Sequence, residues 1–75
     1  MERENAGFRI VAEVPIAKDT ELVIGFKETS LGEQYVCWFC KDKTNYYWGD
    51  YSHTYRKAIY SLIKRLNDYF PGAPK

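Results

Sequence analysis

Two cysteines spaced as Cys-x-x-Cys, Cys37 and Cys40, are the residues whose types most directly suggest chemistry. In a thiol redox site, the first cysteine of this motif lies at a helix N-terminus, where the dipole lowers the thiol pKa. Here the motif falls in a predicted strand, in which residues three apart point to opposite faces. A structural zinc site needs four ligands, and His53 is the only histidine of the chain. We therefore interpret both cysteines as small apolar core residues and predict no metal and no cofactor.

Catalytic motifs are absent from the sequence. His53 has no second group spaced to orient it or to act as a nucleophile. The chain has no glycine-rich phosphate loop, no His-Glu-x-x-His motif and no nucleophile elbow. The sequence thus predicts a non-enzymatic protein in which His53 is a polar residue near the start of a helix.

An aromatic run at residues 46–51, Tyr-Tyr-Trp-Gly-Asp-Tyr, can supply binding chemistry. Strand alternation divides the run into two pairs on opposite faces, Tyr46 with Trp48 and Tyr47 with Tyr51. One pair is expected to pack under a helix. The other suits a protein interface, where Trp, Tyr and Arg are enriched, or a base-stacking surface beside Lys41 and Lys43. Structural packing of both pairs is the third interpretation.

Four strands must position these residues. Alternating side chains predict strands at residues 8–16 and 21–28. Residues 34–41 are apolar on both faces, as in a central strand, and residues 46–51 predict a fourth, aromatic strand. The connections are short, which favours antiparallel neighbours and hence a meander. Five apolar side chains of the first strand are expected to share one face: Phe8, Ile10, Ala12, Val14 and Ile16.

The last segment, residues 55–70, predicts an amphipathic helix. Ser52 or Thr54 can cap its start, and Pro71-Gly72 stops it. The predicted core-facing stripe consists of Tyr55, Ala58, Ile59, Leu62, Ile63, Leu66, Tyr69 and Phe70.

The predicted fold class is α+β: a four-stranded antiparallel meander followed by one C-terminal helix packed on one sheet face. A chain of 75 residues is too short for two cores, so residues 7–71 form a single domain. Residues 1–6 are predicted to be a disordered N-terminal tail, and residues 72–75 a C-terminal tail.

One helix, about 10 Å wide, cannot cover both faces of four strands spaced ~4.8 Å apart. We therefore expect an apolar face left bare by the helix, which a protein partner or a second copy would bury. The residues expected there are Val11, Val23 and either Tyr35, Cys37 and Phe39 or Val36, Trp38 and Cys40. Trp48, together with Trp38 and Tyr46, is the predicted centre of this surface.

Charge is unevenly distributed along the chain, although the net charge is only +1. Residues 1–40 carry seven acidic and four basic side chains, whereas residues 41–75 carry three acidic and seven basic ones. Such a split can mark a basic face for an anionic partner, or simply the solvent side of a helix. Four helix cations are predicted to orient docking around the aromatic anchors: Arg56, Lys57, Lys64 and Arg65.

Two strings of the sequence resemble small uncharacterised domains encoded by phages and mobile elements of Gram-positive bacteria. They are Gln34-Tyr35-Val36-Cys37-Trp38 and the aromatic run at 46–51, followed by Ala58 and Arg65 on the helix. The resemblance covers about residues 34–66, and those domains carry Thr where this chain has Cys37. It implies a genome-conflict context, including anti-CRISPR proteins and related inhibitors of host defence, but no activity and no residue roles.

The leading functional hypothesis is a small binding protein that occupies the surface of a bacterial defence or nucleic-acid-processing protein. The alternatives are direct binding of DNA or RNA by sheet aromatics and the basic helix face, and a homodimer that buries the open sheet face. No apolar run approaches the ~20 residues of a membrane span, and the polar N-terminus is unlike a signal peptide. The sequence predicts no membrane association and a cytoplasmic location in a bacterial host.

Overall fold

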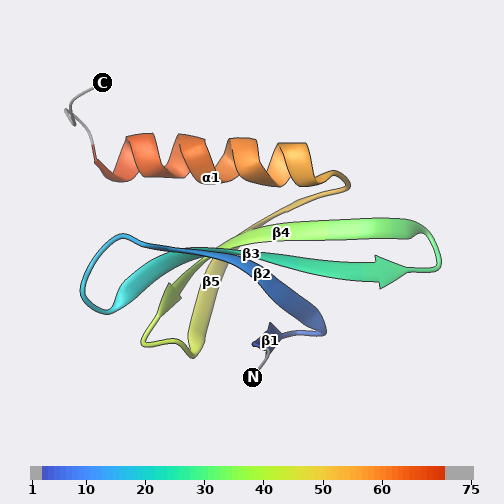
Figure 1. Ribbon diagram of the computed structural model, residues 1–75, viewed down its shortest axis with the longest axis horizontal. Coiled ribbons are helices and arrows are strands. Elements are labelled where there is room, and N and C mark those ends of the chain that lie inside the picture. The colour runs from blue at the N-terminus through green and yellow to red at the C-terminus, as the bar shows by residue number, and fades with distance from the viewer. Residues whose placement is uncertain (1–2, 71–75) are drawn as a thin grey trace.

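The computed structural model describes residues 3–70, which form a five-stranded antiparallel sheet with one helix on one face (Figure 1). The strands are β1 (Glu4–Asn5), β2 (Phe8–Pro15), β3 (Thr20–Thr29), β4 (Gly32–Lys41) and β5 (Asn45–Ser52), and the helix is α1 (Tyr55–Tyr69). The strands lie in sequence order in the sheet, as a meander. The predicted α+β class and single C-terminal helix are confirmed, but the sheet has five strands where the sequence predicts four.

The additional strand, β1, falls within the predicted N-terminal tail. Glu4 pairs with Arg9 and Asn5 with Phe8 across a two-residue turn. Ala6 and Gly7 both have positive φ values, 53° and 83°, which is typical of a type I′ hairpin turn. A two-residue strand is too short to show alternation, so the sequence pattern does not reveal it. The predicted helix stop at Pro71-Gly72 and the tail at 72–75 lie outside the described residues.

A β-bulge divides β2 into two halves that face opposite sides of the sheet. Ile10 pairs with Gly25 and Ala12 with Ile24, which leaves Val11 as the extra residue. Because one inserted residue reverses the alternation, Ile10 faces away from α1 and Ala12 faces toward it. The prediction that the apolar residues from Phe8 to Ile16 share one face is therefore wrong.

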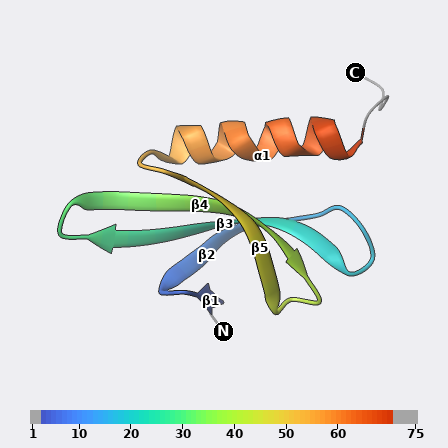
Figure 2. The same cartoon turned by 180° about the vertical axis from the view of Figure 1, so that it is seen from behind.

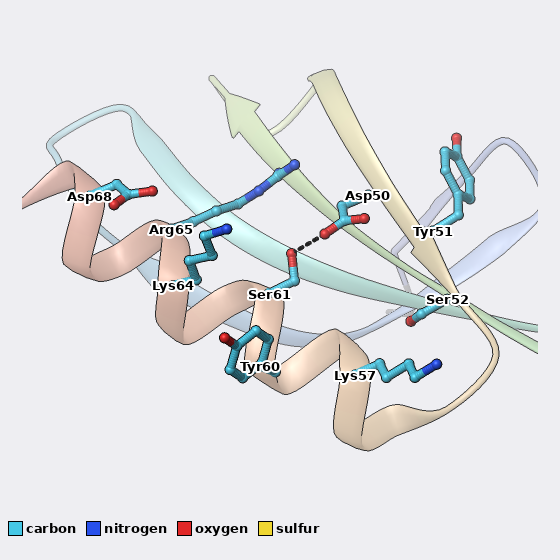
Figure 3. Close-up of a pocket in the computed structure, with 9 residues that line it drawn as sticks. All are labelled: Asp50, Tyr51, Ser52, Lys57, Tyr60, Ser61, Lys64, Arg65 and Asp68. Atoms are coloured by element: carbon cyan, nitrogen blue, oxygen red, sulfur yellow. Dashed lines mark hydrogen bonds between the residues drawn. The ribbon is translucent and has the colours of Figure 1, made fainter.

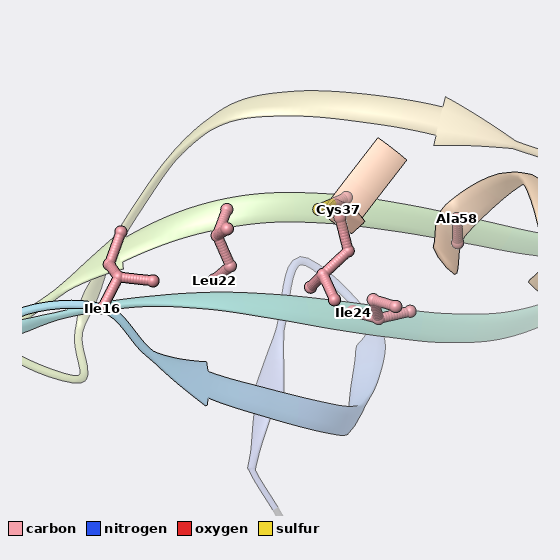
Figure 4. Close-up of a cluster of buried hydrophobic side chains, with 6 residues drawn as sticks. Ile16, Leu22, Ile24, Cys37 and Ala58 are labelled. Atoms are coloured by element: carbon pink, nitrogen blue, oxygen red, sulfur yellow. The ribbon is translucent and has the colours of Figure 1, made fainter. Parts of the chain in front are cut away.

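The sheet separates two hydrophobic clusters. The cluster beneath the helix, shown in Figure 4, consists of Ile16, Leu22, Ile24, Cys37, Ala58 and Leu62. The cluster on the opposite face consists of Phe8, Val23, Val36, Trp38 and Cys40. Cys37 and Cys40 belong to different clusters, as strand alternation predicts.

The face without the helix is covered by the chain itself. Trp38 is only 4% exposed and lies edge-on against Phe8 and Tyr46, with ring centroids 5.5 Å and 5.4 Å away. The sheet is curled, and β1 lies on the side opposite α1 (Figures 1 and 2). Of the two alternative sets, Val23, Val36, Trp38 and Cys40 lie on this face, and the expectation that it is bare is wrong, because Phe8 and Ile10 of β2 and Tyr46 of β5 pack over it.

The helix begins at the predicted cap: the Thr54 hydroxyl accepts a hydrogen bond from the Lys57 amide, 3.2 Å away. Its buried side is rotated from the predicted stripe toward Ser61. Ala58, Ser61 and Leu62 are its buried residues. Four members of the predicted stripe are exposed instead: Tyr55, Ile63, Tyr69 and Phe70. Within residues 3–70, no helix has the length and apolar character needed to cross a membrane.

Candidate functional site

A second β-bulge positions Trp48. Cys37 pairs with Asp50 and Phe39 with Tyr47, so Trp48 and Gly49 together lie opposite Trp38. Trp48 has a φ of 55°, in the left-handed region that costs a residue with a Cβ about 1–2 kcal/mol. Its side chain is 72% exposed. The bulge therefore directs a large aromatic side chain into solvent from a strained backbone.

The same bulge separates Tyr46 from Trp48, so their predicted common face is wrong. Tyr46 pairs with Cys40 and packs on Trp38, on the face away from the helix. Its hydroxyl accepts a 2.9 Å hydrogen bond from Arg3. Burial raises the pKa of Tyr46, although the bond from Arg3 acts in the opposite direction. Tyr46 is thus a half-buried residue of the second core.

The exposed Trp48 belongs to an aromatic cluster with Phe39 and Tyr47, which are half-buried. The rings of Phe39 and Tyr47 stack nearly parallel, with centroids 5.7 Å apart. The Trp48 indole lies edge-on to both, at 5.6 Å from Phe39 and 5.2 Å from Tyr47. The Arg65 guanidinium lies 5.3 Å from the centre of the Phe39 ring.

A groove of about 580 Å³ lies between β5 and α1 (Figure 3). We call it the β5–α1 groove; its lining residues are Asp50, Tyr51, Ser52, Lys57, Tyr60, Ser61, Lys64, Arg65 and Asp68. The Ser61 hydroxyl donates a 2.5 Å hydrogen bond to Asp50 Oδ2, which joins the helix to the strand. Arg65 donates a 3.1 Å bond to the Cys37 carbonyl, so one residue links the groove to the aromatic cluster.

Cationic groups line the helix side of this groove. Lys57 and Lys64 are exposed, and neither forms an ion pair within residues 3–70. Asp50 and Asp68 also line the groove, so its charge is mixed with a small positive excess. The lysines at the rim of such a surface can orient an anionic group. Asp50 already accepts the hydrogen bond from Ser61.

The structure brings four of the seven predicted site residues to one side of the molecule: Trp48, Lys57, Lys64 and Arg65. Trp38 is buried in the core, so its predicted role as an exposed anchor is wrong. Arg56 is exposed on α1 but does not line the groove. The sequence pattern does not place Asp50, Tyr60 or Ser61 in a site, and it names Phe39 only in one of the two alternative sets for the bare sheet face. An isolated glycine in a strand can indicate a bulge, so Gly49 is the signal that could have corrected the parity.

A cluster of ion pairs around the buried Glu21 lies on the face of the sheet away from the helix. The Glu21 side chain is 5% exposed, and its carboxylate pairs with Arg3 at 2.9 Å and with Lys43 at 3.2 Å. Arg3 also pairs with Glu13. Burial acts to raise the pKa of Glu21, but the bonds from Arg3 and Lys43 outweigh it and lower the pKa overall. The cluster joins the N-terminal segment to the hairpin between β4 and β5.

Both cysteines are buried. Burial raises the pKa of the Cys37 and Cys40 thiols, which disfavours the reactive thiolate. His53 is exposed just before the helix. Within residues 3–70, no group of three or more His, Cys, Asp or Glu residues is placed to hold a metal ion.

A second exposed surface is apolar. Taking about 100° per residue, Tyr55, Ile63 and Phe70 lie on the helix flank opposite the groove. Val11, extruded by the bulge in β2, lines a shallow depression with Tyr55. This flank carries no cluster of charges comparable to that of the groove.

Comparison of the chain with protein-family models, curated proteins and solved structures finds no match. Its fold and surface define the class: a small α+β protein with a curled antiparallel sheet, one covering helix, and a surface at β5 and α1 that combines an exposed Trp48 with a groove of mixed charge.

Proposed function

We propose that this protein is a non-enzymatic binding module that occupies the surface of a larger protein through Trp48 and the β5–α1 groove. The observation that carries the proposal is the conformation of Trp48, which is exposed on a bulge with a φ of 55°. Burying a side chain of this size stabilises by about 1.5–3 kcal/mol, and this chain leaves it in solvent. Backbone strain of this kind is concentrated at functional sites.

The cations beside Trp48 support a protein interface. Trp and Arg are enriched among the residues that contribute most to binding energy, and Trp48 and Arg65 both contact Phe39. Lys64, next to Arg65, and Lys57, nearer the start of the helix, line the same groove. There they can accelerate and orient docking of an acidic surface. Trp38 and Tyr46, which pack in the second core, have no part in this surface.

Nucleic-acid binding is the competing function, favoured by the juxtaposition of Lys57, Lys64 and Tyr60 along one groove. One feature argues against it: the net charge is only +1, whereas nucleic-acid-binding domains usually have a clearly basic balance. Electrophoretic shifts with short single- and double-stranded oligonucleotides test it. Retardation at about 50 mM salt that disappears steeply as salt rises would favour nucleic acid over a protein partner.

The partner class remains a prediction. A bacterial defence or nucleic-acid-processing protein, met in the cytoplasm of a bacterial host, is the partner that we propose from the sequence resemblance. A homodimer is the third possibility, although the bare sheet face that suggested it is buried within the chain. Sizing chromatography with light scattering separates self-association from binding to another protein.

The experiment is quantitative affinity capture from bacterial lysate, with mass spectrometry of the retained proteins. Three baits are compared: the natural chain, Trp48→Ala and Leu31→Ala. Leu31 is 94% exposed in the turn between β3 and β4, so its variant removes an exposed apolar side chain elsewhere. A partner retained by the natural chain and Leu31→Ala but lost with Trp48→Ala supports the proposal. Retention of the same proteins by all three baits, or no protein retained specifically by the natural chain, contradicts it.

A further inference from the structure

The free edge of β5 is the structural feature from which a binding mode can be inferred. β5 is the last strand of the sheet and pairs with β4 alone. An edge strand presents unpaired backbone N–H and C=O groups, which are a template for another strand. Asp50, Tyr51 and Ser52 of this strand line the β5–α1 groove.

The helix beside this edge makes the groove a slot for an extended chain. Figure 3 shows α1 and β5 meeting near Ser52 and Lys57 and diverging toward Asp68, with Lys64 and Arg65 between them. Recognition by strand addition uses this arrangement, in which backbone hydrogen bonds provide affinity and flanking side chains provide specificity. The groove volume of about 580 Å³ is within the range of ligand-binding clefts.

Charge indicates which extended chain would fit. The helix carries four cations, Arg56, Lys57, Lys64 and Arg65, against a single acidic residue, Asp68. Lys57 and Lys64 line the β5–α1 groove. Both side chains are exposed, and neither has an ion-pair partner within residues 3–70. An incoming strand with carboxylates on its helix-facing side would pair with both lysines.

We propose that an acidic, extended segment of a protein partner adds to β5 as a further strand and lies in the β5–α1 groove. Lys57 and Lys64 contact its carboxylates, and the Trp48 indole contacts the segment where it leaves the groove. This inference rests on the proposed protein-binding function and specifies the partner's chemistry.

Other occupants fit this edge less well. A phosphate backbone offers acceptors but no N–H donors, so it cannot satisfy the strand carbonyls. A second copy would bring its own β5, which contains one acidic residue, Asp50, and would juxtapose two cationic helices. An acidic peptide satisfies both the donors and acceptors of the edge and the charge of the helix.

The probe is a phage-displayed library of random ten-residue peptides, panned against the full chain. Enriched peptides are expected to be rich in Asp and Glu. The variant carrying Lys57→Glu and Lys64→Glu should bind a synthetic enriched peptide at least tenfold more weakly. The control carries Lys18→Glu and Arg56→Glu, which change the net charge equally at exposed sites outside the groove, and should weaken binding less than threefold. No enrichment, enrichment of neutral or basic peptides, or equal weakening by both variants overturns the proposal.

Two N-methylated analogues of the enriched peptide test strand addition itself. Each carries methyl groups on alternate backbone nitrogens, so one analogue blocks the edge that faces β5 and the other blocks the opposite edge. We expect one analogue to lose binding at least tenfold while the other retains it. Equal behaviour of the two, or displacement of the peptide by a ten-nucleotide single strand at the same concentration, contradicts strand addition.

The lysine variants also separate this inference from the proposed function. If the Trp48-dependent partner of the affinity capture is retained by the variant with Lys57→Glu and Lys64→Glu, the binding function stands and strand addition is overturned. If Trp48→Ala does not affect capture, the proposed function itself fails.

Discussion

Trp38 and Gly49 occupy adjoining space so tightly that a Cβ on Gly49 would lie 2.8 Å from the indole Nε1. At the other end of the indole, a Cβ on Gly25 would lie 3.2 Å from Cζ3. The Trp38 side chain on β4 therefore extends over both neighbouring strands, each of which provides a glycine beneath it. The bulge at Trp48 and Gly49 allows this packing, so the buried indole and the exposed indole depend on the same backbone irregularity.

Substituting Gly49 by Ala should destabilise the fold by about 1–3 kcal/mol, because the added methyl group collides with a core indole. The free energy of unfolding, from urea denaturation followed by circular dichroism, measures this effect. Trp38→Phe in the same chain should recover part of the loss, since the smaller ring leaves space for the methyl group. Purely additive effects of the two substitutions would contradict the direct contact.

The backbone strain at Trp48 predicts an unusual order of stabilities. Trp48→Gly should be more stable than Trp48→Ala by about 1 kcal/mol, since only glycine adopts the positive φ without strain. At a position with negative φ, such as Val11 in the other bulge, glycine should instead be the less stable substitution. Thermal unfolding of the four variants checks both orders. If glycine is less stable than alanine at position 48, the strain assigned to Trp48 is wrong.

Acid should weaken the fold through Glu21. Its pKa is lowered in the folded state, so its stabilising effect is complete above the unfolded value of about 4.3 and is lost as pH falls through the folded pKa. Glu21→Gln should therefore cost about 1–3 kcal/mol at pH 7 and much less near pH 3. Urea denaturation of both proteins at pH 7, 5 and 3 measures the difference. If the difference in unfolding free energy between the two proteins stays constant over this range, ionised Glu21 does not stabilise the fold.

Both cysteine thiols should be unreactive in the folded protein. Burial raises the pKa of Cys37 and of Cys40, and both side chains are inaccessible. Iodoacetamide at pH 7.5 should label neither thiol in native buffer and both in concentrated urea, as read by intact-protein mass spectrometry. Rapid labelling of the native chain would instead indicate an activated cysteine.

The fold could largely be predicted from the sequence because its signals are local. The alternation of β2 and β3 and the apolar and aromatic runs of β4 and β5 predict strands. Thr54 caps the helix, and the short connections define a meander. The two bulges could not be found by assigning alternate residues to opposite faces. A single inserted residue leaves the apolar pattern of the sequence intact and reverses the faces of the residues beyond it. The rotation of α1 depends on the bonds that Ser61 and Arg65 make to distant strands, which the helix sequence alone does not contain.

The candidate site, like the fold, was predictable where its signals are local and not where it depends on tertiary structure. Residue type leads us to predict Trp48 and the helix cations as binding residues, and the structure places Trp48, Lys57, Lys64 and Arg65 on one side. Trp38 and Trp48 are indistinguishable by residue type, and only the bulge decides which is buried. The closure of the second face depends on the curl of the whole sheet, which is a property of all five strands together.

Amide hydrogen exchange, read by NMR on the free protein and on its complex with the Trp48-dependent partner, tests the central claim most directly. We expect slowed exchange at residues 50–52 of β5 and along α1 from Lys57 to Asp68, with no change in the turn at residues 30–32. Exchange that slows only at that turn, or only on β2 near Val11, would contradict a binding surface formed by β5 and α1.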